Sequence, residues 1–360
     1  MSHRRYNPLL NEWVLVAKNR IKRPWQGDGS SSKAAITSNS SNTSTATIVA
    51  NNPLAPGGQR ANNRLTPMYS CTFVFQNDFP SLTDQSSESP TNDELFRIEQ
   101  AKGTCRVICY HPNSNITMAR MSIDEIEKVI NVWIDQMNEL KEKYEWIQIF
   151  ENKGTIMGCS NPHPHGQLWA SNYLPTIQEK KYLNQKIQSY KERTGGILLM
   201  DYMKKELEKK ERIVSENENW VTVVPFWAYW PFETMILPKR NIKSLYDITE
   251  AEKRTLASAI KVLLVKYDNL FKCSFPYAMG WHSAPTGKYL KQDNDFWTLH
   301  AVFYPPLLRS AAIKKFEAGY ELMAEKQRDI TAEGAAKLLR EQPEVHYEDA
   351  SSSNSTPISS

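Results

Sequence analysis

The sequence predicts an α+β fold of two similar units, each with mostly antiparallel strands and one covering helix. The first observation is a pair of helix-start motifs, Ser122–Glu125 and Thr249–Glu252, which lie 127 positions apart. In each motif the hydroxyl side chain can cap the helix while the glutamate reaches back to the capping residue's amide. The second observation is a pair of prolines, Pro112 and Pro238, which end strand-like runs and lie 126 positions apart. The shared spacing indicates an internal duplication.

Each unit is expected to contain a strand, an amphipathic helix and a second strand in the same order. Apolar residues at steps of three and four mark the buried stripe of each helix, and short apolar runs mark the strands. The expected elements are a strand at 105–110, a helix with apolar positions from 123 to 140 and a strand at 146–150, and then a strand at 235–237, a helix with apolar positions from 256 to 270 and a strand at 297–303. We expect two similar sheets that join across a shared interface.

Composition and the internal duplication together divide the chain into five segments. Two of them are dominated by Ser, Thr, Asn and Ala, and such segments bury too little apolar surface to offset the entropy of ordering. The predicted organisation is an N-terminal arm at 1–26, a low-complexity loop at 27–50, a first unit at 51–195, a second and degenerate unit at 196–349, and a disordered tail at 350–360.

Charge and cysteine content exclude several classes of protein. The 360 residues carry 44 basic and 40 acidic side chains, a formal net charge of +4, with no basic run that would indicate a nucleic-acid partner. The longest apolar stretch, 220–232, contains two prolines and is too short to span a bilayer. The N-terminal residues lack the apolar core of a signal peptide. Five scattered cysteines without a CxxC pair indicate reduced thiols, so we expect a cytoplasmic protein.

The densest group of reactive side chains lies in residues 158–169, Gly-Cys-Ser-Asn-Pro-His-Pro-His-Gly-Gln-Leu-Trp. Alternate side chains of an extended segment share one face, so His163, His165 and Gln167 are expected to point the same way. One imidazole can attack phosphorus while the amide and loop N–H groups hold the non-bridging oxygens. A His-X-His pair alone is also typical of a metal site or of ordinary polar residues. The glycine and serine before the pair, and Gln167 after it, favour a phosphate ester.

The string Asn161–Gln167 resembles the active-site signature of the galactose-1-phosphate uridylyltransferase family, a branch of the histidine-triad superfamily. The resemblance continues in order over residues 4–8, 23–25, 77–79, 151–154, 230–234, 279–282 and 304–310. It implies two fused histidine-triad-like units and a ping-pong reaction of galactose metabolism, the Leloir pathway. His165 takes UMP from UDP-glucose and releases glucose 1-phosphate, and the uridylyl-histidine then passes UMP to galactose 1-phosphate to give UDP-galactose. Imidazole suits this role because it is nucleophilic at neutral pH.

The same resemblance implies a role for each matching residue. The implied catalytic group is His165, Gln167 and Ser160. The residues implied in substrate binding are Arg20, Arg23, Asn77, Asp78, Asn152, Gly158, Cys159, Ser160, Gln167, Lys315, Phe316, Tyr320 and Glu321. The two arginines neutralise the diphosphate, and the last four residues contact the hexose in the neighbouring subunit's site, which implies a homodimer with shared active sites. Taken alone, the arginines are also consistent with a solvated basic cluster, and the last four with an amphipathic helix face.

The family commonly carries two metal sites, and both depart from the expected ligands here. Most ligand positions hold other residues, which are Asn52, Ala55 and Ser114 at the first site and Lys181 and Val302 at the second. Histidines remain at His163 in the first site and at His282 and His300 in the second, where Glu179 is a conceivable substitute. At most one weakly held divalent ion, zinc or iron, is expected, because tetrahedral zinc needs more ligands than either set offers.

Two other functions stay open from the sequence. A sugar-nucleotide or dinucleotide phosphorylase of the same superfamily would share the nucleophile and use phosphate as acceptor, although the stretch 315–321 favours a hexose phosphate. Hydrolases of the superfamily usually have a third histidine where Gln167 stands, which argues against hydrolysis. A catalytically retired binding protein would explain the altered metal positions, but the intact His165 and Gln167 oppose it. Glu317 also departs from the family, which usually has an apolar residue there.

Overall fold

The computed structural model describes residues 2–17, 52–85, 90–186 and 190–352. Arg20, Arg23 and the predicted loop at 27–50 lie outside these ranges. All six elements expected from the two repeated patterns are present. The strands end within three residues of the expected positions, and each helix begins directly after its capping residue.

The main sheet has nine strands, and every neighbouring pair is antiparallel. The strands are, in spatial order, β3 (Phe73–Gln76), β5 (Gly103–Cys109), β7 (His165–Ser171), β6 (Trp146–Lys153), β11 (Tyr277–His282), β12 (His300–Tyr304), β10 (Thr234–Pro238), β9 (Trp220–Val223) and β8 (Ile213–Glu216). The two sheets that were expected to join across a shared interface do so edge to edge. Strand β6 of the first unit pairs with β11 of the second, and the two units form one continuous sheet.

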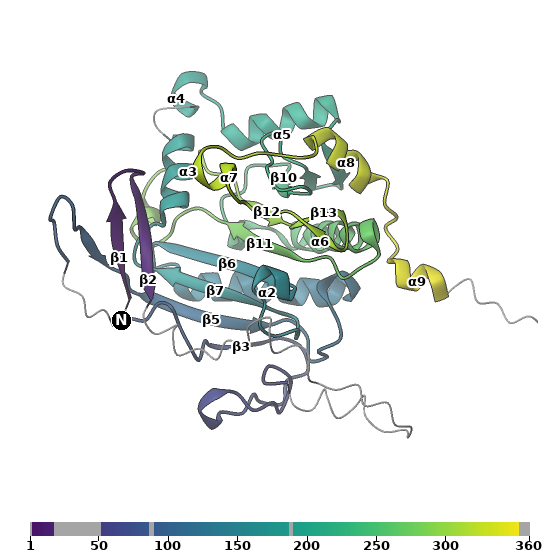
Figure 1. Cartoon of the computed structure of the whole chain (residues 1–360), viewed down its shortest axis with the longest axis horizontal. Coiled ribbons are helices and arrows are strands. Elements are labelled where there is room, and N and C mark those ends of the chain that lie inside the picture. Colours follow the sequence, from purple (N-terminus) through teal and green to yellow (C-terminus); the bar gives the residue numbers. More distant parts are fainter. Residues whose placement is uncertain (1, 18–51, 86–89, 187–189, 353–360) are drawn as a thin grey trace, which may run out of the picture.

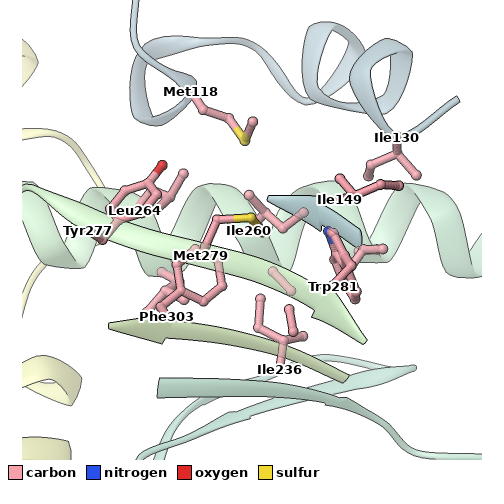
Figure 2. Packing of buried hydrophobic residues seen from close by; sticks show 14 of the residues in the cluster. Met118, Ile130, Ile149, Ile236, Ile260, Leu264, Tyr277, Met279, Trp281 and Phe303 are labelled. Atoms are coloured by element: carbon pink, nitrogen blue, oxygen red, sulfur yellow. The ribbon is translucent and has the colours of Figure 1, made fainter. Parts of the chain in front are cut away.

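Helices α2 (Ile123–Leu140) and α6 (Glu250–Phe271) cover one face of this sheet. Both predicted capping boxes are confirmed, because Ser122 and Thr249 each accept the third helical amide and receive the glutamate in return. The two helices pack against each other and share one core with the strands. Figure 2 shows Ile130 of α2 and Ile260 of α6 in one cluster with Ile149 and Trp281, which come from the two strands at the junction. The two units therefore bury a single apolar core.

The opposite face of the sheet carries the smaller elements. Helix α5 (Leu198–Lys209) packs on β8 to β10, and a small sheet of β2 (Glu12–Ala17), β1 (Ser2–Asn7) and β4 (Ile98–Gln100) stands beside the ends of β5, β6 and β7 (Figure 1). The remaining helices and strands are α3 (Thr176–Lys186), α4 (Lys191–Thr194), β13 (Leu307–Ser310), β14 (Ile313–Lys314), α7 (Tyr320–Met323), α8 (Ala332–Arg340) and α9 (Tyr347–Ser352). None of the helices in the described part of the chain is long and apolar enough to cross a membrane.

Cross-strand register shows which side chains share this second face. Residues directly opposite one another on antiparallel strands project to the same side. Gln167 lies opposite Phe150, Phe150 opposite Gly280, and Gly280 opposite Val302. The histidine motif of the first unit and the remaining histidines of the second unit therefore lie on one face, away from α2 and α6.

Candidate active site

A glycine-bounded loop leads into the histidine motif. Gly158 has a φ of 78°, a backbone conformation that favours glycine, and Cys159 and Ser160 follow it before the strand. The Asn161 side-chain oxygen then accepts the His163 N–H at 2.9 Å, which turns the chain. Strand β7 begins only after this bend. The expected extended segment through the whole motif is therefore wrong for His163, which is 1% exposed and precedes the strand.

His165 is the first residue of β7 and is half-buried. Its Nδ1–H donates to the His163 carbonyl at 2.8 Å, and since a carbonyl only accepts, this nitrogen carries the proton. The neutral ring then has its lone pair on Nε2. Gln167 lies two residues along on the same strand face, as the alternation predicted. An imidazole in the nucleophilic tautomer therefore sits beside a carboxamide.

Trp169 orients that carboxamide. Its indole Nε1–H donates to Gln167 Oε1 at 3.2 Å, and because an indole N–H only donates, the amide oxygen faces the ring. The two N–H groups of Gln167 therefore point away from Trp169. Gly166, between His165 and Gln167, faces the core, where an added Cβ would lie 1.9 Å from the Tyr110 hydroxyl. The close packing of Tyr110 against the backbone, and not only the approach of a substrate, accounts for a glycine at this position.

A second group of side chains lies two strands away on the same face. Phe75 of β3 is opposite Val107, and Val107 is opposite Gln167. With strands about 4.8 Å apart, Phe75 lies about 10 Å from Gln167. The Arg60 guanidinium stands 3.8 Å above the Phe75 ring, and its Nε is 3.7 Å from a carboxylate oxygen of Asp78. The sequence reasoning missed Arg60, for which no local pattern gave a signal.

This group contains polar atoms that are buried without hydrogen bonds. Within the part of the chain that the structure describes, Nε and Nη1 of Arg60 and one carboxylate oxygen of Asp78 have no hydrogen-bond partner. Asn77 uses its side-chain oxygen to accept the Phe79 N–H at 2.9 Å, so its amide donors turn elsewhere. Asn152 of β6 is half-buried, two residues beyond Phe150 on the active-site face. Buried polar groups normally find partners, so these atoms suit a polar ligand.

The predicted hexose-contacting residues lie at the far end of the sheet. Lys315 pairs with Glu321 at 2.6 Å, and the Phe316 ring meets Trp230 edge-on at 6.1 Å. Tyr320 opens α7 and is 61% exposed. In Figure 1, α7 lies near β10 and β12, with β11 and β6 between it and β7. One chain therefore does not bring this stretch beside its own His165.

Glu317, the unusual charge in this stretch, forms an ion pair with Lys326. Its side chain and those of Lys315, Phe316 and Trp230 line one small pocket. The pairing with Lys326 compensates the negative charge at that position.

His163, the remaining ligand of the first expected metal site, is held by hydroxyl groups. Tyr69 donates to the Leu54 carbonyl at 2.7 Å, so its oxygen can accept the Nε2–H of His163 at 2.7 Å. Nδ1 then accepts from Ser114 Oγ at 2.8 Å. Burial lowers the pKa of His163 to about 4, which keeps the ring neutral. Both ring nitrogens already have partners, and the imidazole has no lone pair left for a metal.

The second expected metal site contains an amine. His282 and His300 are buried and stacked with ring centres 4.8 Å apart. Lys181 Nζ lies 3.4 Å from His282 Nδ1 and 3.2 Å from His300 Nε2. Burial lowers the pKa of Lys181 to about 8 and that of His300 to about 3. Glu179 is exposed, so the expectation of a substitute ligand there is wrong, and Gln178 contacts His282 instead at 3.1 Å.

Neither set of residues fits a metal ion. A basic amine at the centre of the second cluster competes for the imidazole lone pairs and repels a cation. At the first, Asn52 pairs with Asn161 through two amide hydrogen bonds of 2.8 and 3.0 Å, where thiolates would be needed. Among the described residues, no group of three or more His, Cys, Asp or Glu side chains could hold a metal ion.

Comparison with known proteins places this geometry in a family. Residues 1–175 match the model described as galactose-1-phosphate uridyl transferase, N-terminal domain, and residues 179–351 match its C-terminal domain. The galactose-1-phosphate uridylyltransferase of Rattus norvegicus is 50% identical over 346 residues, covering 96% of this chain and 89% of that protein. The Haemophilus influenzae enzyme of the same name is 48% identical and covers 96% of each.

Solved structures agree with this result. A uridylyltransferase structure superimposes with a TM-score of 0.78 at 26% identity, covering 94% of this chain and 98% of that one. An ADP-glucose phosphorylase from Arabidopsis thaliana has the same fold, with a TM-score of 0.64 at 20% identity over 95% of this chain and 100% of that one. The family models and the close relatives span nearly the whole chain, and the chain therefore belongs to the galactose-1-phosphate uridylyltransferase family.

Proposed function

We propose that this chain transfers UMP from UDP-glucose to galactose 1-phosphate, with the UMP resting on His165 between two displacements. The observation that carries the proposal is the hydrogen bond from His165 Nδ1–H to the His163 carbonyl. It leaves the lone pair on Nε2, the atom that would attack phosphorus. Membership of the family makes the chain a nucleotidyltransferase. The tautomer supports the further step of a covalent intermediate.

The two displacements balance atom by atom. In the first, Nε2 of His165 forms a bond to the phosphorus next to uridine, and the bond from that phosphorus to the bridging oxygen breaks. Glucose 1-phosphate leaves with this oxygen. In the second, a phosphate oxygen of galactose 1-phosphate attacks the same phosphorus, the N–P bond breaks, and UDP-galactose leaves. The amide donors of Gln167 would hold a non-bridging oxygen through both steps, where negative charge develops.

The group around Arg60 is proposed to bind the nucleoside. A pyrimidine base offers a flat apolar surface and, on its edge, an imide with both donors and acceptors. Phe75 supplies a ring surface, and Arg60 and Asp78 supply N–H donors and a carboxylate oxygen that form ion pairs at 3.7 Å but no hydrogen bonds. Uracil would satisfy these buried atoms, whose desolvation otherwise costs about 1–3 kcal/mol each. The resemblance also implies nucleotide contacts for Asn77, which follows β3, and for Asn152, which lies on β6, three strands across the sheet.

The hexose site is proposed to come from a second copy of the chain. The stretch from Lys315 to Glu321 lies near β10 and β12, and strands β11 and β6 separate β12 from β7 (Figure 1). Phe316 and Tyr320 are exposed. A homodimer would bring this stretch to the partner's His165. Mixing a Lys315→Ala chain with a His165→Ala chain should then restore part of the activity, because one site in each hybrid is intact. No recovery after demonstrated subunit exchange would contradict the shared site.

The uridylyl intermediate is tested with UDP-glucose labelled at the phosphorus next to uridine. Without acceptor, one label per active site should appear on the peptide carrying His165, with an equal amount of glucose 1-phosphate. Galactose 1-phosphate should discharge the label as UDP-galactose. A His163→Gln chain is the control and should still be labelled. Label on His163, or turnover without any label, would overturn the mechanism. If inorganic phosphate discharged the label instead, the chain would be a phosphorylase. If the chain showed neither label nor turnover, it would be a binding protein.

A further inference from the structure

The second unit contains a buried cluster that the proposed reaction does not use. Lys181 comes from α3, the helix after the active-site strand, whereas His282 ends β11 and His300 begins β12. We propose that the side-chain amine of Lys181 replaces the metal ion that the family resemblance implies for this cluster. The amine then joins α3 to the second unit, and this chain needs no metal there.

The His300 ring is oriented toward the amine. Its Nδ1–H donates to the Thr298 carbonyl at 2.9 Å, so the lone pair of the neutral ring lies on Nε2. Lys181 Nζ stands 3.2 Å from this Nε2, at hydrogen-bond distance from a lone pair. The same nitrogen is the one that could have bound a metal. The cluster therefore keeps the imidazole orientation of a metal site and presents it to an N–H donor.

The second imidazole approaches the same point. His282 is stacked on His300 with 8° between the ring planes, and its Nδ1 lies 3.4 Å from Lys181 Nζ. Gln178, one turn earlier on α3, accepts the Nδ1–H of His282 through its side-chain oxygen at 3.1 Å, because a carboxamide oxygen only accepts. The amine therefore donates to His300 and lies beside the His282 ring without a hydrogen bond to its Nδ1. Two residues of α3 thus reach one strand-end pair, as ligands around a common centre would.

The surroundings compensate the charge of the amine. The carboxylate of Glu233 is buried, accepts the backbone N–H groups of Tyr229 and Trp230 at 2.9 and 3.2 Å, and interacts electrostatically with Lys181. A buried carboxylate of this kind would lose a compensating charge if the lysine were removed. The lysine is therefore part of a built cluster and not a side chain that happens to pass the two rings.

The test compares metal content and thermal stability, neither of which depends on the proposed reaction. Wild-type protein purified with added zinc and then dialysed against a chelator should hold no stoichiometric metal, and its Tm should be the same with and without the chelator. Lys181→Glu restores an oxygen ligand beside the two imidazoles. It should hold about one zinc per chain, and its Tm should fall when the zinc is removed.

A second variant covers the case in which Lys181→Glu does not fold. Lys181→Met keeps the length of the side chain but removes every donor, so Nε2 of the buried His300 loses its partner and Glu233 loses a compensating charge. Its Tm should fall by about 2–6 °C, without any metal gained. The matched controls are Lys180→Glu and Lys180→Met, because Lys180 is the next residue of α3 and pairs with Glu12 at the surface. The controls should change neither property.

Three results would overturn the proposal. They are a wild-type chain that keeps one metal per chain through dialysis, a folded Lys181→Glu chain that binds no zinc, and a Lys181→Met chain with an unchanged Tm. Each concerns only the cluster of Lys181, His282 and His300. Loss of the uridylyl intermediate, by contrast, would appear only in the labelling of His165, so the two proposals fail separately.

Discussion

Strands β7 and β12 occupy equivalent places in the two halves of the sheet, and each begins at a histidine. In both, Nδ1–H donates to the carbonyl two residues earlier, at 2.8 Å for His165 and 2.9 Å for His300. Both neutral rings therefore have their lone pair on Nε2. The two rings differ in what surrounds that nitrogen, since His300 meets the Lys181 amine and His165 lies half-buried beside Gln167.

This difference separates two requirements for a nucleophile. The backbone hydrogen bond sets the tautomer, but His300 has the same bond and its lone pair accepts from an amine. Two residues further along each strand, Gln167 offers amide donors in the first half and Val302 offers none in the second. Catalysis then requires phosphate donors beside the imidazole, in addition to the tautomer.

The largest expected effect comes from changing each histidine to the same residue. His165→Gln should lose about four or more powers of ten in turnover, because no nucleophile remains. Its Tm should stay close to that of the wild type, since the side chain is half-buried. His300→Gln should keep turnover within about threefold and lower the Tm by several degrees, because it disturbs a buried cluster.

Turnover with labelled UDP-glucose and a thermal melt measure both properties on the same samples. If His300→Gln lost as much turnover as His165→Gln at an unchanged Tm, the assigned division between the two strands would be wrong.

Local signals in the sequence predicted the covering helices well. Ser122 and Thr249 confirm the point, because a capping box depends on four consecutive residues and both boxes form. The pairing of β6 with β11 could not be predicted in this way. It joins residues such as Glu151 and Met279, more than 120 positions apart, and register at that distance depends on the assembled core.

The same distinction applies to the site. Alternation along β7 placed His165 and Gln167 together correctly. It failed for His163, whose position depends on a turn and on hydroxyl partners 94 and 49 positions away. The odd lysine at 181 was visible in the sequence, but its contacts with histidines 101 and 119 positions away were not. Arg60 was missed because only the fold brings it over Phe75.

The junction between the halves offers a test of intermediate size. Glu151 of β6 lies directly opposite Met279 of β11, so one unit places a carboxyl where the other places an apolar side chain. Burial raises the pKa of Glu151 to about 7, even though Tyr277 donates to it at 3.3 Å. An unfolded glutamate titrates near 4.5. Between these values the folded chain holds a proton that the unfolded chain has lost.

The sign of the effect follows from linkage. Because the pKa is raised on folding, this contribution to stability is complete below pH 4.5 and is lost as the pH rises through about 7. Glu151→Gln has no such titration. Relative to the wild type, the variant should gain about 1–3 kcal/mol of unfolding free energy between pH 5 and pH 8. Urea unfolding at the two pH values measures it, and an equal difference at both would contradict the buried neutral carboxyl.

The smallest expected effect concerns the orientation of the Gln167 amide, for which the second half has no counterpart because Val302 stands at the equivalent position. Trp169→Phe keeps an aromatic ring on β7 and removes the N–H that fixes Gln167 Oε1, together with part of the indole ring. The carboxamide can then rotate, so kcat/KM should fall by about three- to tenfold, the value of one ordinary hydrogen bond. Trp146→Phe is a matched control, because Trp146 Nε1 donates to Gln148 at the same 3.2 Å on the neighbouring strand β6. That variant should change kcat/KM by less than about twofold at a comparable Tm. Equal losses in both variants would mean that the indole acts through packing, and the orienting role of Trp169 would be lost.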